Sequence, residues 1–138
     1  MALDVITKRI VEHYMVPGDS LALWPDVFHL TFVSNPGVAF GLLAGNQLIL
    51  AMFSLAVTVA IICYGPWYTR DIPHAGWFLG LLAGGALGNA IDRLFRGEVT
   101  DFLDFRIWPV FNLADCAIVV GAGLLLLNII RYSQGARG

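Results

Sequence analysis

A long stretch without any Asp, Glu, Lys or Arg constrains this chain more than any other feature. It extends from Leu30 to Tyr68, and inside it the segment from Leu48 to Tyr64 is almost entirely apolar. A helix needs roughly 20 such residues to cross the hydrocarbon core of a bilayer. The 138 residues are 58% hydrophobic and have a mean hydropathy of +0.75, which is more apolar surface than a soluble domain of this size can bury. We therefore expect a membrane protein.

Apolar segments divide the chain into predicted membrane spans. The second span covers residues 46–66, the third 75–92 and the fourth 112–131, where Asp115 interrupts the apolar run. The apolar start of residues 1–16 is too short to cross a bilayer by itself. All of these segments belong to one membrane domain, and their length favours an all-α fold.

The polar connections between the spans predict which loops meet. Residues 17–45 contain many turn residues and one short strand-like run, from Leu30 to Val33, so we expect an extramembrane loop with some β structure. The link between the second and third spans is short, which makes them antiparallel neighbours. The loop around Asn35 and the loop at residues 93–111 must then lie on the same side of the membrane.

Glycine spacing in the third span predicts close helix packing. Gly80, Gly84 and Gly88 recur every four residues and leave one helix face bare. Such a face lets the backbone of another helix approach closely.

Composition argues against several classes of function. The net charge is only -2 and there is no cluster of Lys and Arg, so nucleic-acid binding is not expected. The three histidines lack metal-ligand spacing, and we expect neither a metal nor a cofactor. Cys63 and Cys116 lie inside predicted spans, which disfavours a disulfide. No serine has a nucleophile-elbow pattern, and a Ser-Lys pair would need Lys8, the only lysine, to reach a loop serine.

Three acids at the predicted membrane boundary need a partner, water or a function. They are Asp92, Asp101 and Asp115. Asp115 lies about one turn into an apolar helix, where free N–H groups and the helix dipole favour an ionised carboxylate. From its position alone, helix capping and catalysis explain Asp115 equally well.

Asp101 changes the balance between these two interpretations. It precedes Asp115 by 14 residues, so the loop can fold back and place both carboxylates in one site. Two close carboxylates do not both ionise readily, so one keeps a proton while the other accepts one from water. Such an acid and base pair can hydrolyse a peptide bond without a covalent intermediate. We expect Asp115 to be the ionised member.

The spacing Asn-x-x-Asp occurs twice, as Asn89 with Asp92 and as Asn112 with Asp115. Residues three apart share a helix face. For Asp92, beside Arg93, an interhelical polar clasp is the better interpretation. For Asn112, a clasp and a role in the site are both open.

Five segments, taken together, resemble a known family. They are residues 4–8 (DVITK), 35–40 (NPGVAF), 84–93 (GGALGNAIDR), 99–104 (VTDFLD) and 111–115 (FNLAD). In this order they are similar to the successive motifs of the bacterial lipoprotein signal peptidases, the signal peptidase II family. The resemblance covers nearly the whole chain.

The resemblance implies a bundle of four transmembrane helices with a small extramembrane β region. Because family members have a complete first helix before the DVITK segment, we expect residues 1–16 to be the remnant of a truncated first helix. The β region would be residues 17–45, and its aromatic side chains Trp24, Phe28 and Phe32 would either lie at the membrane surface or pack within the loop.

The resemblance also implies an activity. It is that of an aspartic endopeptidase of the bacterial inner membrane, with its active site at the periplasmic face. The enzyme cuts the signal peptide from a prolipoprotein just before the cysteine that carries diacylglyceryl. We expect a monomer that meets its substrate among membrane lipids.

By motif, Asp101 and Asp115 would form the catalytic pair. Asn35, Asn89 and Arg93 would contact the substrate backbone, and Asn112 would hold the pair in place.

Two other functions compete with this interpretation. A small transporter or complex subunit could use the same aspartates to relay protons or bind a cation. An inactive homologue could still bind lipidated peptides.

Overall fold

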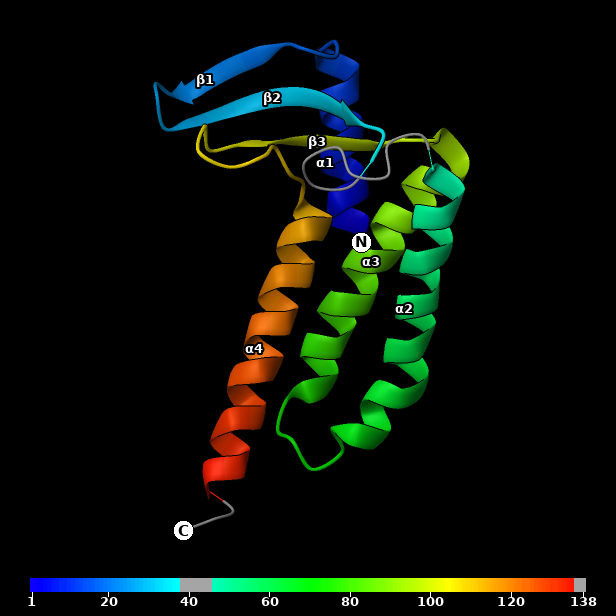
Figure 1. The fold of residues 1–138 in the computed structure, drawn as a ribbon. Helices are drawn as coiled ribbons and strands as arrows, with labels where there is room; N and C mark the ends of the chain where they lie inside the picture. The colour runs from blue at the N-terminus through cyan, green and yellow to red at the C-terminus, as the bar shows by residue number, and fades with distance from the viewer. Residues whose placement is uncertain (38–45, 136–138) are drawn as a thin grey trace.

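The computed structural model describes residues 1–37 and 46–135; the last part of the predicted 17–45 loop lies outside these ranges. The elements in chain order are α1 (Ala2–Tyr14), β1 (Ser20–Trp24), β2 (Phe28–Asn35), α2 (Gln47–Tyr68), α3 (Ala75–Arg96), β3 (Val99–Asp104) and α4 (Leu113–Gly135). Figure 1 shows α2, α3 and α4 side by side, with the sheet across one end of them. The fold is mostly helical with a small β region, which confirms that part of the sequence prediction.

Within residues 1–37 and 46–135, two helices are suited to a membrane. Gln47–Tyr68 and Leu113–Gln134 are long and apolar enough to cross a bilayer, and only 17% and 11% of their most apolar windows are buried in the protein. A core helix of a soluble protein would be mostly buried. Here large apolar side chains such as Phe53, Ile62 and Val119 face outward. The protein is therefore built for an apolar surrounding.

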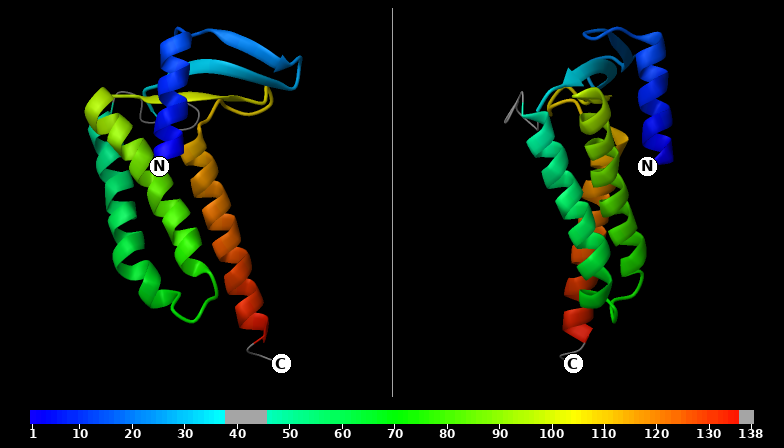
Figure 2. Two further views of the ribbon diagram at one scale, coloured as in Figure 1. Left: turned by 180° about the vertical axis from the view of Figure 1, so that it is seen from behind. Right: turned by 90° about the vertical axis from the view of Figure 1, so that its right-hand side faces the viewer.

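Helix α1 has a different character from these two. It has 13 residues, so it is roughly 20 Å long and shorter than the hydrocarbon core of a bilayer. Figure 2 shows that it stands beside the other helices at the end that carries the sheet. Polar contacts hold it there, because Glu12 Oε1 lies 2.5 Å from Arg96 Nη2 and accepts a hydrogen bond of 2.6 Å from Thr100 Oγ1.

The sheet is antiparallel, with the strand order β1-β2-β3. β3 comes from the segment 93–111, for which no strand was predicted. It pairs with β2 so that Val33 faces Asp101 and Asn35 faces Val99. The predicted meeting of the two loops therefore takes the form of strand pairing.

A small apolar core joins the sheet to α1. It consists of Val11, Phe32 and Phe102, all less than 8% exposed. Phe32 therefore packs within the β region and is not available to a membrane surface, whereas Trp24 is 66% exposed.

Helices α3 and α4 touch through glycines, but not through the glycines that the spacing singled out. A Cβ atom on Gly80 or Gly84 would meet nothing within 4 Å, so the predicted role of these two in packing is wrong. A Cβ on Gly85 would collide with the carbonyl oxygen of Ala114 and lie 2.8 Å from Ile118 Cγ1. Gly88, the third glycine of the pattern, does face Ala114, at 3.7 Å. The four-residue spacing therefore predicted the correct helix. The face that packs against α4 contains Gly85, however, and not the neighbouring Gly84.

Adjacent glycines in α3 provide a matched test of this packing. We predict that Gly85→Ala lowers the free energy of unfolding by about 1–3 kcal/mol, because α3 and α4 must move apart. Gly84→Ala should be neutral or raise it by up to about 1 kcal/mol, because alanine favours the helix and the site is open. Thermal unfolding in detergent, followed by circular dichroism, measures both; equal effects of the two variants would contradict the glycine contact.

Candidate active site

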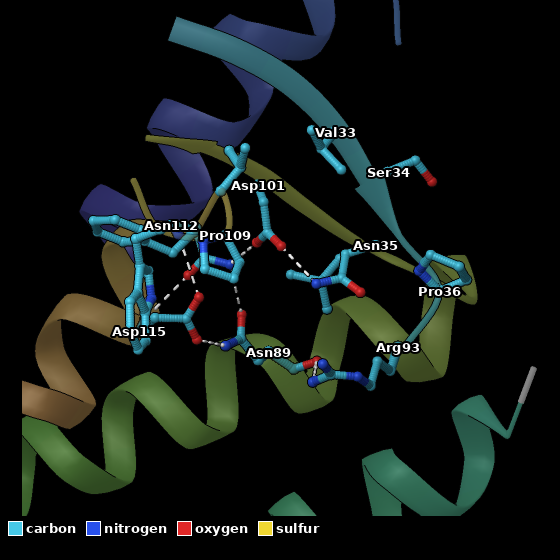
Figure 3. A pocket seen from close by; sticks show the side chains of 14 residues that line it. Val33, Ser34, Asn35, Pro36, Asn89, Arg93, Asp101, Pro109, Asn112 and Asp115 are labelled. Carbon is cyan, nitrogen blue, oxygen red and sulfur yellow. Dashed lines mark hydrogen bonds between the residues drawn. The ribbon is translucent and has the colours of Figure 1, made fainter. Parts of the chain in front are cut away.

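A pocket of about 430 Å³ opens where β2, β3, α3 and the start of α4 converge. Figure 3 shows the polar side chains that point into it. All six site residues predicted from the sequence line this pocket: Asn35, Asn89, Arg93, Asp101, Asn112 and Asp115. Segments far apart in the chain thus supply one site.

The two acids come from different kinds of structure. Asp101 lies in β3, opposite Val33 of β2, and is 2% exposed. Asp115 lies in the first turn of α4, where free backbone N–H groups favour a negative charge. The loop between them folds back, as the sequence suggested, and both carboxyl groups line the same pocket.

Asp101 receives hydrogen bonds from two asparagines whose amide orientation is fixed. Asn35 Oδ1 accepts from the backbone N–H of Gly37 at 3.0 Å, so its Nδ2 donates to Asp101 Oδ2 at 2.7 Å. Asn112 Oδ1 accepts from the backbone N–H of Asp115 at 3.0 Å, so its Nδ2 donates to Asp101 Oδ1 at 2.6 Å. A backbone N–H can only donate, which excludes the flipped amides.

Asp115 is held on both of its oxygens. Asn89 Nδ2 donates to Oδ1 at 2.8 Å, and the backbone N–H of Asn112 approaches Oδ2 at 3.3 Å. The reciprocal contacts of Asn112 and Asp115 form a capping box at the start of α4. Asp115 therefore caps the helix and lines the pocket at the same time, and Asn112 serves both carboxylates.

Arg93 forms the positive wall of the pocket. Its Nη2 donates to the carbonyl oxygen of Gly37 at 2.9 Å, and its Nη1 lies 3.4 Å from the carbonyl oxygen of Asn89. Its Nε is buried and has no hydrogen-bond partner among the described residues. The neighbouring Asp92 points elsewhere and binds Lys8 of α1 at 2.6 Å, so the predicted interhelical clasp is confirmed for it.

Burial governs the charge of Asp101. Removal from water raises the pKa of its carboxyl group to about 6, and the charge of Asp115 adds to this increase. The hydrogen bonds from Asn35 and Asn112 lower the same pKa and offset part of the rise. Asp101 therefore holds a proton at a higher pH than an ordinary aspartate.

Sequence reasoning missed part of the site. Val33, Trp108, Pro109 and Phe111 form much of its wall, and no pattern of polar residues could identify them. Lys8 had no predicted role in the site beyond the DVITK segment and a possible serine partner, yet it is 1% exposed and donates to Asn89 Oδ1. One signal in the sequence could have pointed to a role for this residue: Lys8 is the only lysine of an apolar chain.

The described residues contain no group of three or more His, Cys, Asp or Glu side chains placed to hold a metal ion.

Comparison with known proteins places the chain in a family. The family model described as signal peptidase (SPase) II matches residues 1–131. The chain belongs to the signal peptidase II family. The lipoprotein signal peptidase of Desulfitobacterium hafniense (strain DSM 10664 / DCB-2) is 49% identical over 142 residues, which cover 99% of this chain and 91% of that protein. The lipoprotein signal peptidase of Gloeobacter violaceus is also 49% identical, over 95% of this chain and 77% of that protein.

Two solved structures of bacterial membrane enzymes have a fold similar to that of this chain. A bacterial membrane enzyme determined by the in meso method at 2.3 Å resolution matches with a TM-score of 0.89 at 30% identity, over 97% of this chain and 84% of that one. A second bacterial membrane enzyme, at 1.9 Å, matches with a TM-score of 0.83 at 31% identity, over 93% and 85% of the two chains. The resemblance seen in the five sequence segments is confirmed.

The repulsion between the two acids can be measured directly. We predict that the pKa of Asp101 is about 6 in the wild type and falls in Asp115→Asn, because the neighbouring negative charge is lost. In Asn35→Ala the pKa of Asp101 should rise, because the ionised form loses a hydrogen-bond donor. Titration of the Asp101 side-chain ¹³C signal in detergent micelles measures these values, and identical midpoints in all three proteins would show that the groups do not interact.

Proposed function

We propose that this chain is an aspartic endopeptidase that removes the signal peptide from diacylglyceryl-modified prolipoproteins, cutting just before the lipidated cysteine. Membership of the signal peptidase II family supports the reaction. One observation supports the aspartic type: Asp101 and Asp115 line the same pocket, and each has hydrogen-bond donors directed at both carboxyl oxygens.

The proposed chemistry uses one proton shared between the two acids. Asp101, whose pKa is raised, carries the proton, and Asp115, at the positive end of α4, is ionised. Asp115 takes a proton from a water molecule as the water oxygen bonds to the scissile carbonyl carbon, while Asp101 donates its proton to the carbonyl oxygen. When the C–N bond breaks, the leaving nitrogen takes the proton from Asp115 and Asp101 regains one from the tetrahedral hydroxyl group.

Polar groups around the acids suit an extended peptide. Arg93 lines the pocket, and its guanidinium group, which has five N–H donors, would donate to a substrate carbonyl. Asn35 and Asn89 line the same pocket and would contact the substrate backbone, while Asn112 keeps both acids in place. The apolar wall from Trp108 to Phe111 would receive the side chains near the cleavage point.

We propose the following arrangement in the membrane. α2, α3 and α4 cross the bacterial inner membrane as the second to fourth spans of a four-helix bundle, in which α1 is the first helix. The sheet, with residues 17–45 and 93–111, lies at the periplasmic face, where the pocket opens. The large apolar side chains that face outward on α2 and α4 support this arrangement, because lipid would cover them. A site at the interface can receive acyl chains and peptide together, and the enzyme acts as a monomer.

Substitution of either acid tests the proposal. We predict that Asp101→Asn and Asp115→Asn each lower the rate of cleavage of a diacylglyceryl-modified prolipoprotein peptide by about 1,000-fold or more, since each removes one partner of the acid–base pair. Binding of the same peptide should change little, because asparagine has nearly the same size and shape as aspartate.

Asp104→Asn is the matched control on the same strand. Asp104 does not line the pocket: its Oδ1 accepts from the Arg106 backbone, and its Oδ2 accepts from Thr31 Oγ1 and pairs with Arg106 Nη1, so asparagine disturbs contacts of the strand without touching the two acids. This variant should cleave at close to the wild-type rate per folded protein. If Asp101→Asn or Asp115→Asn still cleaves the peptide, the aspartic mechanism is wrong, and a binding or transport role is favoured.

A further inference from the structure

Lys8 of α1 is buried against α3. Its side chain is 1% exposed, and its ammonium group has three N–H donors that must all be used when water is excluded. It donates to Asp92 Oδ2 at 2.6 Å and to Asn89 Oδ1 at 3.0 Å, and it forms an ion pair with Asp4 Oδ2 at 2.8 Å. Two of its three partners are therefore carboxylates, and the third is an amide oxygen of the pocket.

The third contact sets the orientation of an amide in the pocket. Because Lys8 donates to Asn89 Oδ1, the NH₂ group of Asn89 must point the other way, where it donates to Asp115 Oδ1 at 2.8 Å. Nδ2 of Asn112 also approaches Asn89 Oδ1, at 3.3 Å. A flipped Asn89 would place its NH₂ group against the ammonium and its oxygen against the carboxylate of Asp115. Asn35 and Asn112 are oriented by backbone N–H groups, whereas Asn89 depends on a side chain 81 positions away.

The same cluster also fixes the start of α4. Asp4 Oδ1 accepts a hydrogen bond of 2.9 Å from the backbone N–H of Ala114, the residue before Asp115. Asp4 and Lys8 are one turn apart on α1 and form an ion pair. α1 thus reaches Asp115 by two routes, through Asn89 and through the first turn of α4.

We propose that Lys8 is a positioning residue of the peptidase: its ammonium orients Asn89 so that Asp115 receives an N–H donor, and its charge sets how tightly the two acids hold their shared proton. The proposal rests on the function proposed above and adds α1 to the catalytic machinery.

Several charges face the acids, and the contribution of Lys8 has a definite sign. Asp115 of α4 raises the pKa of Asp101, whereas Lys8 of α1 lowers it. Arg93 of α3 also interacts electrostatically with both acids. Asp4 and Asp92 are the carboxylates in direct contact with Lys8. Removal of the ammonium therefore raises the pKa of Asp101, so the dyad loses its shared proton only at higher pH.

Lys8→Met is the first variant, because methionine fills similar space without charge or donors. We predict that kcat falls about 10- to 100-fold, as expected for loss of one charge-assisted hydrogen bond, while KM changes less than about three-fold. The high-pH limb of the kcat/KM profile should move up by about half a pH unit or more. The midpoint of this limb does not depend on the fraction of folded enzyme.

Glu12→Gln is the matched control for loosening α1. It removes the negative charge that pairs with Arg96, and it replaces no residue that contacts Lys8. This variant should melt at a lower temperature but keep the wild-type kcat per folded enzyme and an unchanged pH profile. If Lys8→Met lowers only the melting temperature, as Glu12→Gln does, then Lys8 is merely structural and the proposal is wrong.

A double variant replaces Lys8→Met if that single variant does not fold. It combines Lys8→Met with Asp92→Asn and so keeps the charge balanced. It removes one positive and one negative buried charge, but Asn89 still loses its ammonium partner. The same upward shift of the high-pH limb supports the proposal, and a wild-type midpoint overturns it. These outcomes differ from failure of the proposed function itself. If that function is wrong, either the wild type does not cleave the peptide or Asp101→Asn still cleaves it.

Discussion

The pairing of β2 with β3 is the constraint on which the rest of the site depends. It places Asn35 beside Asp101, and the chain leaving β3 then turns back into α4, whose first turn carries Asp115. Close backbone contact of α3 and α4 at Gly85 holds Asn89 against the same turn. A small sheet and a glycine contact therefore bring two acids together at the end of an apolar bundle.

Burying two carboxylates is costly, and the structure offsets the cost with donors of fixed orientation. Three asparagines each present an NH₂ group to an acid, because each carbonyl oxygen is occupied by a group that can only donate. Two of these groups are backbone N–H groups and the third is the ammonium of Lys8. The positive charges of Lys8 and Arg93 lie near the acids and limit the repulsion between them. Neither cation is in direct ion-pair contact with Asp101 or Asp115.

Much of this was predictable from the sequence, and the exceptions have physical reasons. The positions of the membrane spans follow from the lengths of the apolar segments. The short loop that joins Asp101 to Asp115 made a shared site for the two acids a reasonable prediction. β3 was missed because its apolar and acidic residues occur in a charged segment, where a strand depends on pairing with a partner distant in the chain. The role of Lys8 depends on how α1 packs against α3 and α4, which no local pattern records. Gly84 was chosen over Gly85 because a four-residue spacing does not tell which side of a helix meets a neighbour.

The central claim is that Asp101 and Asp115 act as one unit. The most direct test compares residual cleavage by the double variant Asp101→Asn, Asp115→Asn with that of each single variant under the same conditions. If the acids share one proton and one water molecule, the double variant should be no slower than the slower single variant, because either substitution already removes the whole mechanism. Losses that multiply in the double variant would mean that the two acids act independently and would contradict the account.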